Sequence, residues 1–462
     1  MSIISDNYNL VLKKLIFNSL NDNLIKEFNK ISSNPNVSNY INLISNLDSS
    51  LSKIATNLIE TAFESLDKGY LTSKNRKRSY HIKAYHKRSM ITVFGEITFN
   101  RTFYLNKRTN KCFCYLDRFL GLKKYDCFDP YIKAMILDYA ADNSLSKTAK
   151  IINDLIGNRV KLDKPFPILS RQYVRYVVSK EIISLPKLKS LPTPDNLYIM
   201  ADEKWIHTQG NHNQDIMTKS IITFDGIDTS NPNRLKLLNK RIFADINNKT
   251  IDKVLDYIYY TYDVDKFKRI YIMGDGALWI KSLRSHFKFN PKVSVISSLD
   301  RFHFNQALHH LTQDNNLSKI LLSYILNNDK ENFNNICLVL IKNNPHRDNT
   351  IINKQNYILN NWFNIINTYK YNLKCSMEAH ISHNLADLFT SRPKGYSLHT
   401  LDKLLNLRLL YKNGHNLKRL YLNNYNSKKV LIMNNKDINY SIFKPFDYID
   451  SYSLPFNLRD WF

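Results

Sequence analysis

The 462-residue sequence contains few of the residues that define several protein classes, with 5 Cys, 10 Gly and 13 Pro. So little glycine and proline excludes a collagen-like or low-complexity chain. The scattered cysteines are too few for a disulfide framework and favour a reducing compartment. No apolar run approaches the roughly 18 residues that a membrane-spanning helix requires, and the first residues lack the apolar core of a signal peptide. We therefore expect a folded cytoplasmic protein with no membrane partner.

Several motifs of cofactor chemistry are also missing. No Gly-rich phosphate loop occurs, which argues against a nucleotide-driven motor. The HExxH pattern of zinc proteases is absent, although two histidines follow Glu378. Cys112, Cys114 and Cys127 lack a fourth ligand at a familiar spacing. A zinc site is therefore not expected.

Acidic residues are scarce relative to basic ones, with 40 Asp and Glu against 66 Lys and Arg and a net charge of +26. An AT-biased genome explains part of the lysine, because its codons also favour the abundant Asn, Ile and Tyr. Such a bias does not remove acids, so the surplus still predicts attraction to phosphate backbones that weakens with salt. We expect a nucleic-acid-binding protein.

The amino-terminal part divides into a helical region, 1–65, and a basic β-rich region, 66–125. Between residues 74 and 111 there are eleven Lys or Arg and one acid, Glu96. Alternating apolar residues predict two strands that are joined at residues 94–96. Such a hairpin suits a DNA backbone, although a solvated strand face has the same pattern. The DNA-binding candidates here are Arg76, Lys77 and Arg78.

Residues 126–185 show three segments of helical periodicity. Ser144 and Ser170 stand at N-cap positions, and Gly157 stands where a helix would stop. This order predicts a helix-turn-helix module, although simple three-helix packing would give the same pattern. A proline-containing linker, LPKLKSLPTPDN, follows. The last helix would present Arg171, Gln172 and Arg175 to DNA.

The next block is α/β. Residues 195–303 predict three strands, a helix and then alternating strands and helices, which is the order of a ribonuclease-H-like core. Residues 304–371 are helical throughout and predict an all-α insertion. Residues 372–415 would complete the core. The pattern does not assign the tail, 416–462.

Three acids stand where catalytic carboxylates are expected. Asp202 and Asp275 end apolar strands, and Glu378 begins a helix. Functional side chains gather at the carboxyl ends of strands, and carboxylates there suit a pair of Mg²⁺ or Mn²⁺ ions about 4 Å apart. Structural roles remain open: a helix cap, an Asp-Gly turn and a first-turn acid, respectively. Glu203 would face the other side of the strand as a structural residue or hydrogen-bond partner.

Two further groups accompany these acids. Asp300 and His303 lie three residues apart at a strand–helix junction, where they could share a proton or orient water. A purely structural histidine is the alternative. In the loop 390–397, Arg392 and Lys394 are candidates for holding a phosphate. The alternative is a solvated loop.

Four strings resemble one known family. They are ADEKWIHTQ around Asp202, GDGALWIK around Asp275, LDRFH around Asp300, and CSMEAHISHNLADLFTSRPKGYS around Glu378. Their order over residues 195–415 is similar to that of the ISLre family of bacterial insertion-sequence transposases. That family is also filed as an uncharacterised protein family and is grouped with the Mutator-like DDE transposases.

The resemblance implies a DDE transposase that cuts and joins DNA at the terminal inverted repeats of an element. Its triad would be Asp202, Asp275 and Glu378, which would bind Mg²⁺ or Mn²⁺, and Asp300 with His303 would form an Asp-x-x-His signature. The partners would be element-end and target DNA, with a homodimer holding two ends. Two alternatives remain: a nuclease of the same fold that cuts without joining, and a transposase-derived DNA-binding protein without catalysis.

Overall fold

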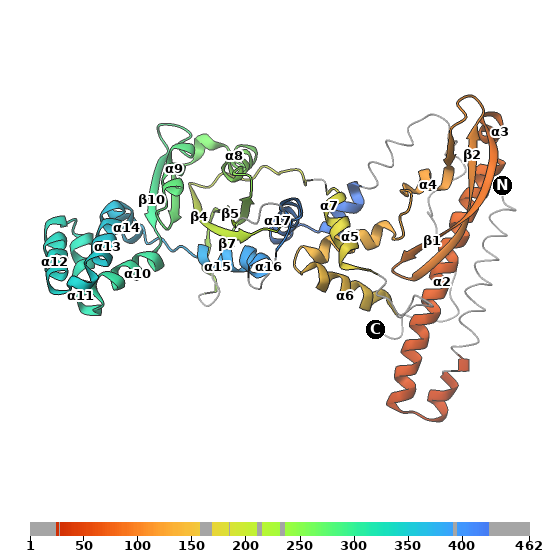
Figure 1. Ribbon diagram of the computed structural model, residues 1–462, viewed down its shortest axis with the longest axis horizontal. Helices are drawn as coiled ribbons and strands as arrows, with labels where there is room; N and C mark the ends of the chain where they lie inside the picture. Colours follow the sequence, from red (N-terminus) through yellow and green to blue (C-terminus); the bar gives the residue numbers. More distant parts are fainter. Residues whose placement is uncertain are drawn as a thin grey trace. The chain divides into compact units, whose positions relative to one another are not determined.

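The computed structural model describes residues 25–26, 28–157, 169–183, 185–209, 215–231, 236–390 and 395–424 (Figure 1). Within this part, contacts divide the chain into two compact units. The first runs up to Ile132 and also takes in residues 155–157 and 422–424. The second takes in Lys133–Asp154 and the described residues from 169 to Tyr421. Arg392, Lys394 and most of the tail 416–462 lie outside the described residues.

The first unit contains the predicted basic hairpin. Its strands form an antiparallel sheet in the order β1-β2-β3. The strands begin only at residue 80, so residues 66–79, which we assigned to the β-rich region, are helical. The helix restarts there because the Ser73 side chain accepts a hydrogen bond from the Arg76 N–H at 3.2 Å. The elements are α2 (Val37–Thr72), α3 (Lys74–Ser79), β1 (Tyr80–Thr92), β2 (Gly95–Asn106), β3 (Cys112–Cys114) and α4 (Tyr115–Leu120).

Helix α2 covers the part of β2 that β3 leaves unpaired. Strand β3 pairs only with residues 103–105 of β2. Beyond it, Glu60 accepts a hydrogen bond from the Thr98 N–H at 2.6 Å, and Glu64 accepts one from the Asn100 N–H at 3.0 Å. The two acids lie four residues apart and so share one face of the helix. They replace a neighbouring strand along this edge.

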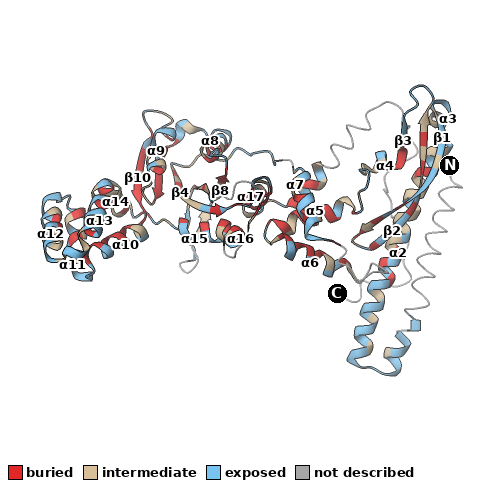
Figure 2. Ribbon diagram, viewed as in Figure 1, coloured by how far each residue is buried: buried red, intermediate tan, exposed pale blue. Residues whose placement is uncertain are grey.

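The second unit is built on a mixed α/β sheet. Its strands are β4 (Asn196–His207), β5 (Asp215–Phe224), β8 (Arg241–Asp245), β9 (Arg269–Gly274) and β10 (Ser294–Leu299). Their order is β10-β9-β4-β5-β8. Strands β4, β9 and β10 are parallel, whereas β5 and β8 are antiparallel to their neighbours. The strands stand out as buried in Figure 2. A separate ladder joins β6 (Gly226–Asp228) to β7 (Lys236–Leu238).

Alternation along β4 decides which side chains face the helices α8 (Thr250–Thr261) and α9 (Leu278–His286). Leu197, Ile199 and Ala201 are fully buried in one cluster with residues of both helices. Successive side chains of a strand point to opposite faces. Residues 198, 200 and 202 therefore face the other side of the sheet.

The three predicted helices before the linker are α5 (Pro130–Ala140), α6 (Leu145–Ile156) and α7 (Arg171–Lys180). Both predicted caps are present, since Ser144 and Ser170 accept hydrogen bonds from backbone N–H groups three residues on. Helix α7 ends three residues earlier than its apolar pattern predicts. The compact units divide within α5 and α6, whereas we expected a boundary at the proline-containing linker; α7 and the sheet belong to one unit.

Residues 304–371 contain helices and no strand, as the sequence predicts. The insertion has its own core, in which Phe333 and Trp362 are buried. It also pairs with the edge strand β10, because Thr368 Oγ1 accepts from the Leu299 N–H at 3.1 Å and Asn367 donates to the Ser297 carbonyl at 2.9 Å. Its elements are α10 (Arg301–Thr312), α11 (Asn315–Leu326), α12 (Lys330–Asn343), η3 (Pro345–Arg347), α13 (Asp348–Asn360) and α14 (Trp362–Lys370).

The chain then returns to the sheet through α15 (Met377–Ile381), the π-helical turn η4 (Ser382–Ala386), α16 (Asp387–Phe389) and α17 (Leu398–Lys412). The side chain of Arg408 on α17 is fully buried. It donates to the carbonyls of His383, Asn384 and Ala141 and to the carboxylates of Asp142 and Asp387. A guanidinium has five N–H donors, so every donor is satisfied, and two of them hold carbonyls of the π turn.

Replacing Arg408 tests this packing. Arg408→Met removes five hydrogen bonds and leaves three backbone carbonyls without this partner, so we expect the free energy of unfolding to fall by about 3–5 kcal/mol. Chemical denaturation of the full chain measures the change. Arg419→Met, at an exposed position, is the control and should stay within about 0.5 kcal/mol of wild type. Equal stability of the two variants would contradict the assignment.

Candidate active site

Three acids lie at the same level on adjacent parallel strands. Met200 pairs with Met273, and Gly274 pairs with Leu299. Following the register onward places Asp202 on β4 level with Asp275 and Asp300, which directly follow the carboxyl ends of β9 and β10. Strand β4 continues to His207, so the prediction that Asp202 ends its strand is wrong. The Asp300 N–H donates to the Gly274 carbonyl at 2.8 Å, which fixes this alignment.

Gly274 permits the close approach of β4 and β9. A Cβ atom at this position would lie 2.8 Å from the Ala201 carbonyl oxygen and 2.8 Å from Cδ1 of Ile280. Real Cβ atoms do not approach other atoms so closely, and β4 and α9 occupy the space from two sides. The residue before Asp275 must therefore be glycine if β9 is to keep this distance from the residue before Asp202.

Electrostatic coupling links the predicted residues. The pKa of Asp202 is raised to about 6, chiefly by burial and also by the charges of Asp275 and Glu203, while the hydrogen bond from the Glu203 N–H and the nearby His303 oppose the rise. Burial also raises the pKa of Asp300, with contributions from Glu378 and Asp275 and an opposing one from His303. Glu378 begins α15, next to the sheet, where the Ser376 N–H lies 3.4 Å from the Met200 sulfur on β4. The structure thus brings Asp202, Asp275 and Asp300 to one level of the sheet. His303 is near enough to affect the pKa values of Asp202 and Asp300, and Glu378 that of Asp300.

The structural roles foreseen for these acids are partly present as well. Asp202 lies within β4, so the helix-cap interpretation of it is wrong. Asp275 Oδ1 accepts from the Ala277 N–H at 2.9 Å and Gly276 has φ of +87°, so the Asp-Gly turn is present. Asp300 Oδ1 caps α10 by accepting from the Phe302 N–H at 3.1 Å.

The same three acids keep an oxygen for a ligand. Asp202 Oδ1 accepts from the Glu203 N–H at 2.7 Å, so each carboxylate uses Oδ1 locally. Within the described part of the chain, none of the three Oδ2 atoms makes a hydrogen bond. Carboxylate oxygens are the ligands that Mg²⁺ and Mn²⁺ prefer, so these donor atoms are of the chemical type that such an ion binds. Among the described residues, no group of three or more His, Cys, Asp or Glu side chains is placed to hold a metal ion.

Glu203 faces away from the acids, as expected. Its Oε2 accepts a hydrogen bond from Trp279 Nε1 of α9 at 2.6 Å. The ammonium of Lys219 on β5 lies 5.5 Å from the centre of the Trp279 rings. The prediction that Glu203 is a hydrogen-bond partner is confirmed, and its role is to attach α9 to the sheet.

Two residues of the site were missed in the sequence. Burial raises the pKa of the Cys375 thiol, and the charges of Asp300, Asp202 and Asp275 add to the effect. Cys375 belongs to the same sequence string as Glu378, so its position next to a candidate catalytic acid could have identified it from the sequence. The Tyr357 hydroxyl donates to the Asp275 carbonyl at 2.7 Å, and nothing in the local sequence of the insertion indicates that contact.

The predicted DNA-binding residues differ in exposure. Arg171, Gln172 and Arg175 are exposed on α7. The guanidinium of Arg76 donates to the Leu71 carbonyl at 2.8 Å and is partly buried, whereas the side chains of Lys77 and Arg78 are exposed.

Helix α7 begins close to the end of β4. Burial raises the pKa of Tyr396, and the nearby positive charge of Arg171 lowers it. The Tyr396 carbonyl accepts from the Gln209 N–H at 2.9 Å, and Tyr396 bridges to Thr208 next to β4. Arg171 is therefore near Tyr396, which adjoins the residues that follow β4.

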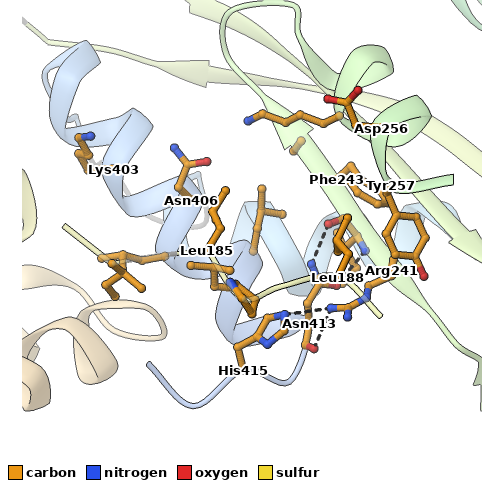
Figure 3. A pocket seen from close by; sticks show the side chains of 18 of the residues that line it. Leu185, Leu188, Arg241, Phe243, Asp256, Tyr257, Lys403, Asn406, Asn413 and His415 are labelled. Atoms are coloured by element: carbon orange, nitrogen blue, oxygen red, sulfur yellow. Dashed lines mark hydrogen bonds between the residues drawn. The ribbon is translucent and has the colours of Figure 1, made fainter. Parts of the chain in front are cut away.

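A separate cavity of about 550 Å³ lies among α8, β8, α17 and residues 181–183 and 185–188 (Figure 3). Its wall is mainly apolar. Asn413 exchanges two hydrogen bonds of 2.9 Å with the backbone of Ile242, and Arg241 donates to His415 at 3.0 Å. None of the candidate catalytic or DNA-binding residues lines this cavity.

Comparisons place the chain among known sequences. The model of the family described as "Uncharacterised protein family (UPF0236)" matches residues 35–425. Two similar relatives are UPF0236 proteins of Caldanaerobacter subterraneus subsp. tengcongensis. One is 27% identical over 387 residues, which is 81% of this chain and 78% of the relative. The other is 26% identical over 385 residues, with the same coverage. No helix in the described residues has the length and apolarity to cross a membrane.

The close approach at Gly274 can be tested by adding one methyl group. Gly274→Ala forces β9 away from Ala201 or displaces Ile280, and overpacking of this kind costs about 1–3 kcal/mol. Thermal and chemical unfolding of the full chain measure the loss. At Gly226 an added Cβ would lie 3.8 Å from its nearest neighbour, so Gly226→Ala is the control and should leave stability nearly unchanged. A wild-type stability for Gly274→Ala would contradict the proposed constraint.

Proposed function

This chain belongs to the uncharacterised protein family UPF0236. From this premise, we propose that the protein is a DDE transposase of an insertion sequence. It binds the terminal inverted repeats, cuts them in a metal-dependent reaction and joins the freed ends to target DNA. The observation that carries the proposal is the alignment of Asp202, Asp275 and Asp300 at one level of three adjacent parallel strands, with Glu378 on a helix near enough to Asp300 to raise its pKa.

The topology supports a ribonuclease-H-like core. Strands β4, β5 and β8 follow one another as an antiparallel set, and β9 and β10 add parallel strands on the other side of β4. The helical insertion lies between the second and third acids of the proposed triad, at residues 275 and 378. This is the arrangement that the resemblance to the ISLre transposases implies.

The carboxylates of Asp202, Asp275 and Glu378 would hold Mg²⁺ or Mn²⁺. Two such ions supply an activated attacking oxygen and charge stabilisation for the leaving oxygen. Mutual repulsion among the carboxylates opposes a closer grouping without a cation. His303 lies one turn into α10, close enough to Asp202 to change its pKa, and serves there to orient water or accept its proton. Asp300 fixes the start of that helix.

The names of the relatives support mobility. The printed name of one C. subterraneus protein joins eleven locus designations, and that of another joins four. Several loci for one protein in a single genome are what repeated insertion of an element produces. A housekeeping enzyme encoded at one fixed locus would not be expected to occur at so many loci.

The charge and α7 support DNA as the partner. A net charge of +26 favours binding to a polyanion, and the exposed basic face of α7 lies beside the end of β4. From Asp202 to Thr208 the strand rises about 20 Å, which equals about six base pairs at 3.4 Å each. Arg171 and Arg175 would therefore hold DNA within about one helical turn of the cut.

The catalytic proposal predicts the behaviour of Asp202→Asn. We expect cleavage and strand transfer to fall at least about 1,000-fold while DNA binding persists, because the amide keeps the shape but loses the charge that binds the cation. A strand-transfer assay with element-end DNA and Mg²⁺ measures both steps. Asp256→Asn, at an exposed position of α8, is the control.

The same assay separates the alternatives. Joining of the cut ends by the wild-type chain supports the transposase. Cutting without joining identifies a nuclease, and binding without cutting identifies a DNA-binding descendant. Full activity of Asp202→Asn would remove the proposed catalytic centre.

The DNA-binding proposal predicts a change in salt dependence. Replacing both arginines, Arg171→Ala with Arg175→Ala, should reduce the slope of log affinity against log salt by about 2, because each lost phosphate contact removes about 1. Fluorescence anisotropy with element-end DNA measures the slope. Lys180→Ala is the matched control, because Lys180 is exposed on the opposite side of the same helix. An unchanged slope in the double variant would exclude α7 from the DNA interface.

A further inference from the structure

The turn that carries Asp275 is held from outside the sheet by the insertion. Asp275, Gly276 and Ala277 connect β9 to α9 in three residues. Within this turn, the backbone carbonyl of Asp275 accepts a hydrogen bond from the Tyr357 hydroxyl at 2.7 Å. Tyr357 lies on α13, 82 positions further along the chain. The insertion therefore contacts the peptide unit that links Asp275 to Gly276.

Asn361 strengthens this contact. Its side chain is 2% exposed, and its Oδ1 would lie 2.6 Å from a Cβ atom at Gly276, so the amide packs directly against the turn. Its Nδ2 donates to the Tyr357 carbonyl at 2.9 Å. Lys281, on the first half of α9, donates to the Asn360 carbonyl at 3.3 Å. Residues at the end of α13 thus contact the turn itself and the helix α9 that follows it.

The tyrosine hydroxyl remains a donor in this place. Tyr357 is partly buried, and both burial and the negative charges of Asp275 and Asp300 raise the pKa of its hydroxyl. The protonated form is favoured, and its proton points at a backbone carbonyl. A change in the position of α13 would therefore be transmitted to this peptide unit.

We propose that Tyr357 is a positioning residue: through its hydrogen bond to the Asp275 carbonyl, the all-α insertion sets the direction of the Asp275 carboxylate toward Asp202. This inference rests on the proposed function, because it assigns the carboxylate to a divalent cation. It gives the insertion a role in assembling the site, in addition to covering the edge of β10. A purely structural tyrosine would affect stability and leave cation affinity alone.

The test compares Tyr357→Phe with Tyr369→Phe in the full chain. Tyr369 is a half-buried tyrosine of the same insertion, and its hydroxyl makes no hydrogen bond within the described residues. Mn²⁺ binding without DNA, followed by electron paramagnetic resonance of the free ion, should weaken about tenfold in Tyr357→Phe and less than twofold in Tyr369→Phe. The Mg²⁺ concentration for half-maximal cleavage should rise by the same factor.

Each outcome decides the inference. Wild-type Mn²⁺ affinity in folded Tyr357→Phe overturns it, even if the variant is less stable. Should that variant fail to fold, Asn361→Ala takes its place; the same weakening is expected, and unchanged affinity in the folded variant overturns the inference. If the wild-type chain binds Mn²⁺ and cuts DNA, and Tyr357→Phe has the same Mn²⁺ affinity, the inference is overturned and the proposed function is retained. A wild-type chain that does neither removes both.

Discussion

The close backbone contact between β4 and β9 is the constraint on which the candidate site depends. Gly274 allows β9 to lie against the Ala201 carbonyl, and the parallel register then carries Asp202 and Asp275 to the same level. Asp300 joins them because its N–H is bonded to Gly274. Burial raises the pKa values of Asp202 and Asp300, and the neighbouring carboxylates add to the effect. The sheet thus holds carboxylates together at an electrostatic cost that a bound cation would offset.

The helical parts around the sheet complete this arrangement from two directions. Arg408 holds the π turn that follows Glu378 and connects it to the loop after α5. On the other side, Tyr357 and Asn361 grip the Asp275 turn from the insertion. Buried, fully bonded polar groups of this kind specify one geometry, because any displacement leaves a donor or acceptor unsatisfied. The acids are therefore set by contacts that lie far from them in sequence.

Positive charge is distributed over both compact units, and each unit presents it differently. In the first unit, exposed side chains of α3 and the hairpin carry the positive charge. The carboxylates of Glu60 and Glu64 on α2 accept hydrogen bonds from the backbone of β2. In the second, Arg171 and Arg175 are exposed on α7. Under the proposed function, the second unit would hold DNA near the cut. The first would add electrostatic binding to the phosphate backbone, which weakens as the salt concentration rises.

The sequence by itself determined the elements: the hairpin, the capped helices, the five strands, the helical insertion and the position of Asp275 at the end of β9. These follow from local physics, since apolar periodicity, capping side chains and turn residues act within a few positions. The assignment of residues 66–79 to the β-rich region was wrong, because charge composition does not separate a helix from a strand. Only the tertiary structure decided that α7 joins the sheet unit and that the Tyr357 hydroxyl contacts the Asp275 carbonyl. Those outcomes depend on packing between distant segments, and a local pattern carries no record of such contacts.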